Sequence, residues 1–195
     1  MHNTKFSAAL LAGGLSRRMK CDKAALEIQG KPLWQRQLDT LNQLQPAELL
    51  ISGRPDGPYA ESGVPIVADR ERRLGPLGGL AALLNYTAYP AMMVLGVDLP
   101  QMHASFLQTL LDQSRAEQSA FVTHDGTRFQ PLAAVYSRAC LPLLEQCLEE
   151  PDRSFQHFIR RGVEQGLIAT RSLLREELPL FYNLNTPEDL EAATS

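Results

Sequence analysis

The sequence is poor in cysteine and has no long hydrophobic run. Its three cysteines, Cys21, Cys140 and Cys147, are an odd number, and their spacing fits neither a disulfide framework nor a zinc site. This usage indicates a reducing compartment. The longest apolar run, at 91–97, is too short to cross a bilayer, and residues 1–5 lack the charged region and apolar core of a signal peptide. We therefore expect a cytoplasmic protein that does not enter the membrane.

No charge of one sign and no low-complexity composition dominates the chain. The 195 residues include 44% hydrophobic and 21% charged residues with only 13 glycines and 13 prolines, which excludes disordered and collagen-like classes and fits one domain. The net charge is −3, but residues 1–75 carry 11 Lys and Arg against 8 Asp and Glu. This asymmetry favours a small anionic ligand near the N-terminal loops over a nucleic-acid surface, which needs a basic face on the whole domain.

Strand patterns alternate with helix patterns along the chain. The first hundred residues predict strands at 6–11, 49–52, 65–68 and 92–97 and helices at 32–46 and 77–86. Beyond them we expect helices around 106–111, 140–148 and 187–193 and strands at 120–123 and 132–136. The alternation predicts a mostly parallel, twisted sheet with helices on both faces. The fold class is therefore α/β with three layers, α/β/α, in a single domain over residues 1–195.

Four loops are expected to meet at one edge of this sheet. In open parallel sheets, ligands bind at the carboxyl ends of the strands. That rule places Gly13 with Gly14, residues 52–54, Asp69 and Asp98 along one rim. Such convergence is what a nucleotide site requires.

The strongest motif, L-A-G-G-L-S-R-R-M-K-C-D-K, occupies residues 11–23. Its two glycines let the backbone approach a ligand and present amide donors, while Arg18 and Lys23 add charge for phosphate oxygens. The alternative is a glycine turn followed by a solvated basic loop. The motif is neither a G-x-G-x-x-G fingerprint nor a P-loop, since the one Gly-Lys pair is followed by Pro32.

Asp98 follows a buried strand and precedes a turn at Pro100. A carboxylate in that position is suited to hold Mg²⁺ against substrate phosphates, although an aspartate there could also cap the next helix. Asp69, after another short strand, could be a ligand or a turn residue.

Two glycine- or asparagine-rich segments have two interpretations each. Residues 70–79, R-E-R-R-L-G-P-L-G-G, could be a closing loop over the site or the start of a packed helix. Residues 183–187, N-L-N-T-P, could offer amides to a ligand or form an ordinary turn and cap.

The four histidines lie at no ligand spacing from a cysteine or carboxylate, and no G-x-S-x-G elbow exists. Histidine-bound metal and nucleophilic hydrolysis are therefore not expected.

Taken in order, these motifs resemble the nucleotidyltransferases that open with L-A-G-G-x-S-x-R-M-G-x-D-K, and most closely the bacterial molybdenum cofactor guanylyltransferases. Residues 30–34 resemble the family's G-K-P-L-W, residues 75–79 its G-P-L-A-G and residues 183–187 its N-V-N-T-P. The resemblance covers nearly the whole chain. It implies a Rossmann-like nucleotidyltransferase fold in which residues 1–100 bind the nucleotide and residues 101–195 face molybdopterin.

The resemblance also implies a reaction: transfer of GMP from GTP to the terminal phosphate of molybdopterin, with Mg²⁺ as cofactor and pyrophosphate as product. It implies molybdoenzymes or other cofactor-biosynthesis proteins as partners. Arg18, Lys23 and Asp98 would be catalytic, with Asp98 on the metal. The nucleotide would contact Leu11, Ala12, Gly13, Gly14, Lys23, Ser52, Asp69 and Asp98, and the molybdopterin side would comprise Gly75, Gly79, Asn183 and Asn185.

Two departures from the family pattern and three rival functions stay open. Lys20 replaces the usual glycine, and the strand end before Arg54 is one residue short, so the assignment of Ser52 depends on the alignment. The rivals are a cytidylyltransferase that uses CTP on the same cofactor, a sugar-phosphate nucleotidyltransferase, and a non-catalytic module that binds GTP or carries the cofactor. By resemblance, Gly13 and Gly14 favour GTP over CTP as the substrate, since the cytidylyl relatives tend to have Ala-Gly at these positions. Lys23 and Asp98 argue against a non-catalytic module.

Overall fold

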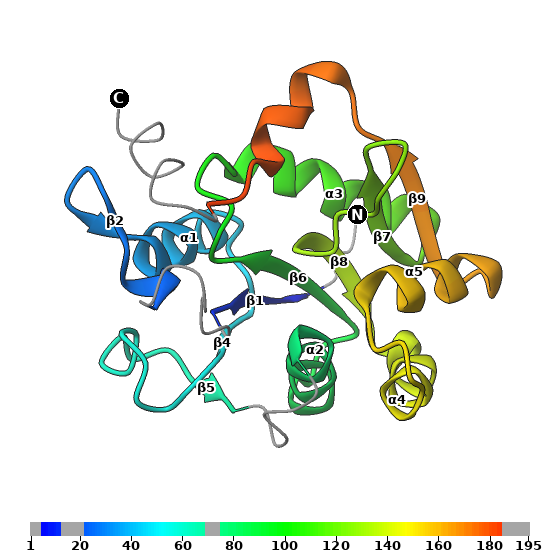
Figure 1. Ribbon diagram of the computed structural model, residues 1–195, viewed down its shortest axis with the longest axis horizontal. Coiled ribbons are helices and arrows are strands. Elements are labelled where there is room, and N and C mark those ends of the chain that lie inside the picture. The colour runs from blue at the N-terminus through cyan, green and yellow to red at the C-terminus, as the bar shows by residue number, and fades with distance from the viewer. Residues whose placement is uncertain (1–4, 13–21, 69–74, 185–195) are drawn as a thin grey trace.

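The computed structural model describes residues 5–12, 22–68 and 75–184 (Figure 1). The strands of the main sheet are β1 (Ser7–Leu11), β4 (Glu48–Ser52), β5 (Ile66–Val67), β6 (Ala91–Gly96), β7 (Ala120–His124), β8 (Ala133–Ser137) and β9 (Ile168–Ser172). A separate small hairpin pairs β2 (Glu27–Ile28) with β3 (Lys31–Pro32). The α-helices are α1 (Leu33–Asn42), α2 (Gly75–Tyr86), α3 (Ala104–Glu117), α4 (Leu141–Glu149) and α5 (Phe155–Glu164). Short 3₁₀ helices are η1 (Lys23–Ala25), η2 (Arg138–Cys140) and η3 (Arg175–Phe181).

The sheet has seven strands in the order β5-β4-β1-β6-β8-β7-β9, and it is mostly parallel, as the sequence predicts. β1 pairs in parallel with β4 and β6, and β7 pairs in parallel with β9. β8 runs antiparallel to both of its neighbours. The short connection from β7 to β8 explains this exception, because a hairpin can join only antiparallel strands.

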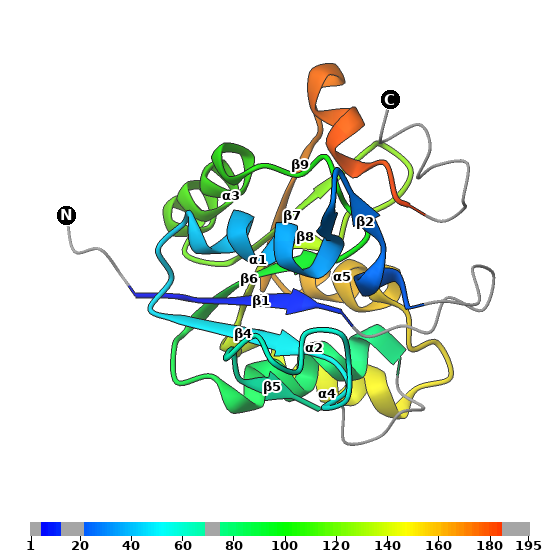
Figure 2. The same ribbon diagram turned by 90° about the vertical axis from the view of Figure 1, so that its left-hand side faces the viewer.

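Helices cover both faces of the sheet, which gives the expected three layers. Figure 2 shows α1 and α3 on one side of β1 and α2 and α4 on the other. Successive side chains of a strand point to opposite faces. In β1, Ala8 and Leu10 accordingly join the core under α1 and α3, whereas Ala9 and Leu11 join the core over α2, α4 and α5. The sheet therefore separates two apolar layers.

Several element ends differ from the sequence-based expectation. The first helix ends at Asn42 rather than near Pro46, because Gln45 takes a left-handed backbone (φ 53°) that closes the helix. α3 is longer than predicted and begins after His103, whose Nδ1 accepts the Phe106 N–H.

The last third holds elements that the sequence analysis did not predict, namely α5, β9 and η3. β9 is an edge strand whose residues are mostly half-exposed, so its hydrophobic pattern is weak. The predicted helix at 187–193 lies outside the described residues. Within the part of the chain that the structure describes, no helix is both long and apolar enough to cross a membrane.

Candidate active site

The carboxyl ends of three central strands form one edge of the sheet. In register, Leu11 of β1 lies between Ser52 of β4 and Gly96 of β6. The Ala12 N–H donates to the Ser52 carbonyl (3.0 Å), and the Val97 N–H donates to the Leu11 carbonyl (3.1 Å). The structure thus brings together those predicted rim residues that it describes.

Lys23 and Asp98 face one another at this edge. The Lys23 Nζ lies 3.6 Å from Oδ2 of Asp98, and the two side chains are only 16% and 17% exposed. Lys23 begins η1, and Asp98 comes two residues after β6. An ammonium group donates charged hydrogen bonds to phosphate oxygens, and carboxylate oxygens coordinate hard divalent cations. The pair can therefore hold a phosphate and a metal ion in one place.

The Asp98 segment is fixed by long-range hydrogen bonds. The Asp98 carbonyl accepts from the Leu184 N–H (3.0 Å), and the next carbonyl, of buried Leu99, accepts from the side-chain amide of Gln37 (2.5 Å). The following helix, α3, is capped by His103 instead of Asp98. The helix-cap alternative for Asp98 is therefore wrong, and its carboxylate is left to the site.

The Lys23 segment is fixed by Asp22. This residue caps η1, since its Oδ1 accepts the Ala24 N–H (3.0 Å). Its other oxygen, Oδ2, accepts a hydrogen bond from Nη2 of Arg54 (2.9 Å), which comes from the loop after β4. Ala24 is fully buried in the core beneath α1 and α3, so the turn that carries Lys23 is anchored on both sides.

Ser52 and Gly79 make a close approach between β4 and α2. Ser52 is 4% exposed, and a Cβ added at Gly79 would lie 2.7 Å from its Oγ. A glycine at this position lets the helix approach the strand end. Residues 75–79 form the first turns of α2, which is the packed-helix interpretation of that segment. Gly79 is buried there, and Gly75 is exposed.

Asn183 reaches the same edge from the far end of the chain. It is exposed, and its neighbour Leu184, only 2% exposed, bonds to the Asp98 carbonyl. The structure therefore places the start of this segment next to Asp98, a proximity that the sequence did not predict. The remaining predicted site residues, Gly13, Gly14, Arg18, Asp69 and Asn185, lie outside the described residues, as does Lys20.

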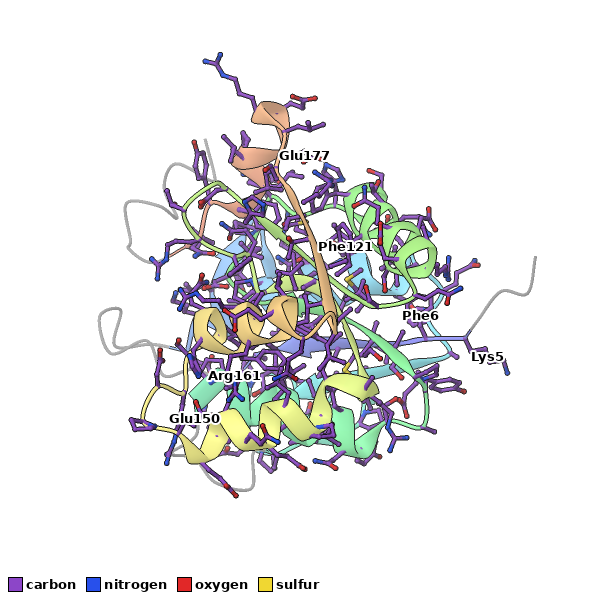
Figure 3. All side chains as sticks on the ribbon, turned by 90° about the vertical axis from the view of Figure 1, so that its right-hand side faces the viewer. Lys5, Phe6, Phe121, Glu150, Arg161 and Glu177 are labelled. Atoms are coloured by element: carbon purple, nitrogen blue, oxygen red, sulfur yellow. The ribbon has the colours of Figure 1, made fainter. Side chains whose placement is uncertain are left out.

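A second polar cluster, not found from the sequence, joins α4 to α5 (Figure 3). The ligand atoms of Cys147, Glu150 and His157 all lie within 4.8 Å of one another, and His157 Nε2 is 2.7 Å from the Glu150 carboxylate. The expectation that no histidine lies at ligand spacing from a cysteine or carboxylate concerned spacing along the chain, and it did not reveal this spatial proximity. Cys147 lies in α4, Glu150 directly follows that helix and His157 lies in α5, so the spacing of the three residues along the chain does not reveal the cluster.

An arginine decides what this cluster can hold. Arg161 Nη1 donates to Glu150 Oε1 and lies 3.9 Å from the Cys147 Sγ. Burial raises the pKa of the Cys147 thiol, against the lowering effect of Arg161. A guanidinium already contacts two of the three groups, so the cluster is an ion-paired link between α4 and α5. The positive charge of Arg161 opposes the binding of a cation there.

The β7–β8 hairpin turns at the carboxyl edge and is held by several side-chain hydrogen bonds. The Asp125 carboxylate accepts hydrogen bonds from the Thr127 hydroxyl and from the amides of Arg128 and Thr127, which lower the pKa of Asp125 to about 2. The Gln156 side chain of α5 bonds both the N–H and the carbonyl of Phe129 (each 2.9 Å). The hairpin is therefore tied to a neighbouring helix.

The chain matches the family described as "MobA-like NTP transferase domain" over residues 8–166. A relative from Opitutus terrae, "Probable molybdenum cofactor guanylyltransferase", is 36% identical over 187 residues, which cover 94% of this chain and 92% of the relative. A "Molybdenum cofactor guanylyltransferase" from Serratia proteamaculans is 30% identical, covering 97% of this chain and 93% of the relative.

Solved structures show the same fold. "Molybdopterin-guanine dinucleotide biosynthesis protein A" from Archaeoglobus fulgidus has a TM-score of 0.78 and 23% identity, covering 96% of each chain. "A nucleotidyl transferase" from Methanothermobacter thermautotroptrophicus has a TM-score of 0.77 at 14% identity, covering 98% of this chain and 97% of that one. The Rossmann-like nucleotidyltransferase architecture predicted from the sequence is thus confirmed.

Proposed function

The chain belongs to the family of MobA-like NTP transferase domains, and from this membership we propose that it transfers GMP from GTP to the terminal phosphate of molybdopterin. It is a nucleotidyltransferase, and its products are the guanine dinucleotide form of the cofactor and pyrophosphate. The observation that carries the proposal is the Lys23–Asp98 pair at the carboxyl edge of β1 and β6.

The proposed reaction needs no nucleophile from the protein. The terminal phosphate of molybdopterin is already an anion that can attack the α-phosphorus of GTP, with pyrophosphate as the leaving group. The protein's task is to align the two substrates and to stabilise the charge that develops on the phosphate oxygens. Lys23 supplies one positive charge from η1, and Arg18 is proposed as a second.

Asp98 is the residue that would hold Mg²⁺. Its carboxylate is a hard oxygen ligand that is partly exposed at the edge of the sheet. Among the described residues, no group of three metal-ligating side chains includes Asp98. A single carboxylate fits Mg²⁺, because this ion takes one or two protein carboxylates and completes its coordination shell with water and substrate phosphates. When bound, the ion would neutralise the charge that develops on the phosphates.

Two groups of residues would divide the substrates between them. The proposed nucleotide contacts are Leu11, Ala12, Gly13, Gly14, Ser52 and Asp69, all within residues 1–100. The proposed molybdopterin side takes Asn183 and Asn185 from residues 101–195, together with Gly75 and Gly79. The bond between Leu184 and Asp98 supports this division, since it draws the C-terminal segment to the edge where transfer would occur.

The proposed location is the cytoplasm, with molybdoenzymes or other cofactor-biosynthesis proteins as the recipients of the product. Cys140 and Cys147 are buried free thiols, which suits a reducing compartment.

The test incubates the purified protein with Mg²⁺, molybdopterin and one of GTP, CTP or ATP, and identifies products by mass spectrometry. We expect a guanine dinucleotide with GTP alone, and no product when Mg²⁺ is removed by a chelator. A cytosine dinucleotide formed with CTP would replace the guanylyl assignment by the cytidylyl one. Intact nucleotide in all three reactions would contradict transfer to molybdopterin, and pyrophosphate released with a sugar phosphate would identify a different acceptor.

A further inference from the structure

The turn that carries Lys23 is too short to fix its own position. η1 has three residues, and a single 3₁₀ turn has little stability in isolation. Within the turn, Ala25 N–H donates to the Asp22 carbonyl (3.0 Å) and Leu26 N–H to that of Lys23 (3.1 Å). Contacts from outside the turn must therefore set where Lys23 stands relative to Asp98.

One such contact comes from Arg54. Its Nη2 lies 2.9 Å from Asp22 Oδ2, while the other oxygen of Asp22 caps η1. The Asp22 side chain is 20% exposed and that of Arg54 40%, so the pair is partly shielded from water. The hydrogen bond with Asp22 raises the pKa of the Arg54 guanidinium. Arg54 thus holds the residue that orients the first turn of η1.

Arg54 is itself held by a small buried cluster. Its backbone N–H donates to the Tyr59 hydroxyl (2.8 Å), and its carbonyl accepts from the Gly57 N–H (3.0 Å). Tyr59 is 1% exposed. A Cβ at Gly53 would lie 1.9 Å from the Tyr59 hydroxyl oxygen, and one at Gly57 2.5 Å from its ring. The loop folds tightly on this ring and gives Arg54 a fixed base.

β4, the strand that precedes the Arg54 loop, also holds the end of β1. The Ala12 N–H donates to the carbonyl of Ser52, two residues before Arg54. β4 and its loop therefore anchor the chain at Ala12 and again at Asp22. The first anchor is at the carboxyl end of β1, and the second is next to Lys23.

We propose that Arg54 is a positioning residue for the transfer reaction, acting through Asp22 to hold Lys23 against Asp98. The proposal rests on the proposed function, because it gives Arg54 a role in the same site. Its role is indirect, since Arg54 contacts Asp22 and the ammonium of Lys23 contacts the substrate phosphates.

A double-mutant cycle with Lys23 provides the test. Arg54→Ala should lower kcat/KM for GTP about 10- to 100-fold in the wild-type background and by less than about 3-fold in a Lys23→Ala background. Arg54→Lys, which keeps a donor and the charge, should recover part of the loss. Equal losses in both backgrounds, or no loss in either, would overturn the proposal.

Two further variants separate positioning from general damage to the loop. Asp22→Asn keeps a capping oxygen but removes the charge that Arg54 meets, so it should reproduce the Arg54→Ala loss and not add to it. Asp56→Asn is the matched control, because Asp56 is the exposed second partner of Arg54 at 3.8 Å. It should leave kcat/KM unchanged. A loss with Asp56→Asn equal to that of Asp22→Asn would contradict the role of Asp22.

A measurement without turnover distinguishes this proposal from the proposed function. The rate at which an amine reagent modifies Lys23, compared with half-exposed Lys31 and followed by mass spectrometry, should rise at least 3-fold in Arg54→Ala. If the wild-type chain makes no dinucleotide while this rise occurs, the proposed function fails and the positioning role stands. An unchanged Lys23 rate in a folded Arg54→Ala variant would overturn the positioning role.

Discussion

The main-chain N–H of Leu184 donates a hydrogen bond to the carbonyl oxygen of Asp98, although the two residues lie far apart in the sequence. Leu184 is buried, so the contact is shielded from water. It makes the placement of the proposed metal ligand depend on the last part of the described chain. The position of Asp98 is therefore a property of the tertiary fold and not of its own loop.

Replacing Asp98 with Asn should abolish most turnover and preserve the fold. The variant keeps the size of the side chain and the Asp98 carbonyl that bonds to Leu184, but removes the charge proposed to bind Mg²⁺. We expect pyrophosphate release to fall by several orders of magnitude at saturating Mg²⁺. Circular dichroism should show an unchanged melting profile. Near-normal turnover would remove Asp98 as the metal ligand.

Replacing Lys23 with Ala should weaken GTP binding. Loss of a charged hydrogen bond costs about 1.5–3 kcal/mol, or roughly 10- to 150-fold in affinity. Isothermal titration with GTP and Mg²⁺ measures this directly. Lys31→Ala is the matched control, since Lys31 pairs with Asp39 on the exposed side of α1. The role of Lys23 is contradicted if both variants bind GTP equally well.

The effect of Gly79→Ala should change sign with the residue at position 52. In the native background the new Cβ meets the Ser52 Oγ at 2.7 Å, so we expect a loss of about 1 kcal/mol in the free energy of unfolding. With Ser52→Ala, the nearest atoms of Leu11 and residue 52 are at 3.7 and 3.8 Å, which is ordinary contact. The higher helix propensity of alanine should then stabilise α2 by about 0.5–1 kcal/mol. Urea denaturation of the four variants tests the cycle, and additive effects would contradict the close approach.

The contribution of Asp125 to stability should depend on pH. Its pKa is lowered from 3.8 to about 2 in the folded protein, so its stabilising effect is complete above pH 4 to 5 and is lost as pH falls toward 2. Since the group is exposed and screened, we expect Asp125→Ala to cost only about 1 kcal/mol at pH 7. Urea midpoints of the wild type and the variant should converge between pH 4 and 2.5. A separation between the two midpoints that stays the same from pH 7 to pH 2.5 would contradict this contribution of Asp125.

Much of the fold follows from the hydrophobic pattern. β1 and β6 are short, mainly apolar runs, and both are buried strands in the middle of the sheet. α5 was missed, although Ser154 precedes apolar residues at helical spacing and caps the helix by accepting the His157 N–H. The sequence therefore contains a recognisable helix signal at α5. β9 offered none, because only Ile168 of its five residues is buried.

The sequence predicted those site residues that lie at or just after the end of a strand, and it did not predict contacts between separate loops. The rule for parallel sheets placed Ser52 and Asp98 at one edge, and the structure does so. The contact between Arg54 and Asp22 could not be predicted, since it joins two loops whose sequences contain no trace of their pairing. The same holds for His157 and Glu150, which meet only because α4 and α5 pack together.

The division of the core by the sheet has a use in protein engineering. Leu107 of α3 belongs to one layer and Leu143 of α4 to the other, with the strands between them. Substitutions at distant sites that share no partners have additive effects on stability. Stabilising changes can therefore be selected separately in the two layers and then combined. The α4 layer contains Leu11, one of the proposed nucleotide contacts, so changes made within α4 itself, as at Leu143, are the safer way to raise heat resistance without altering catalysis.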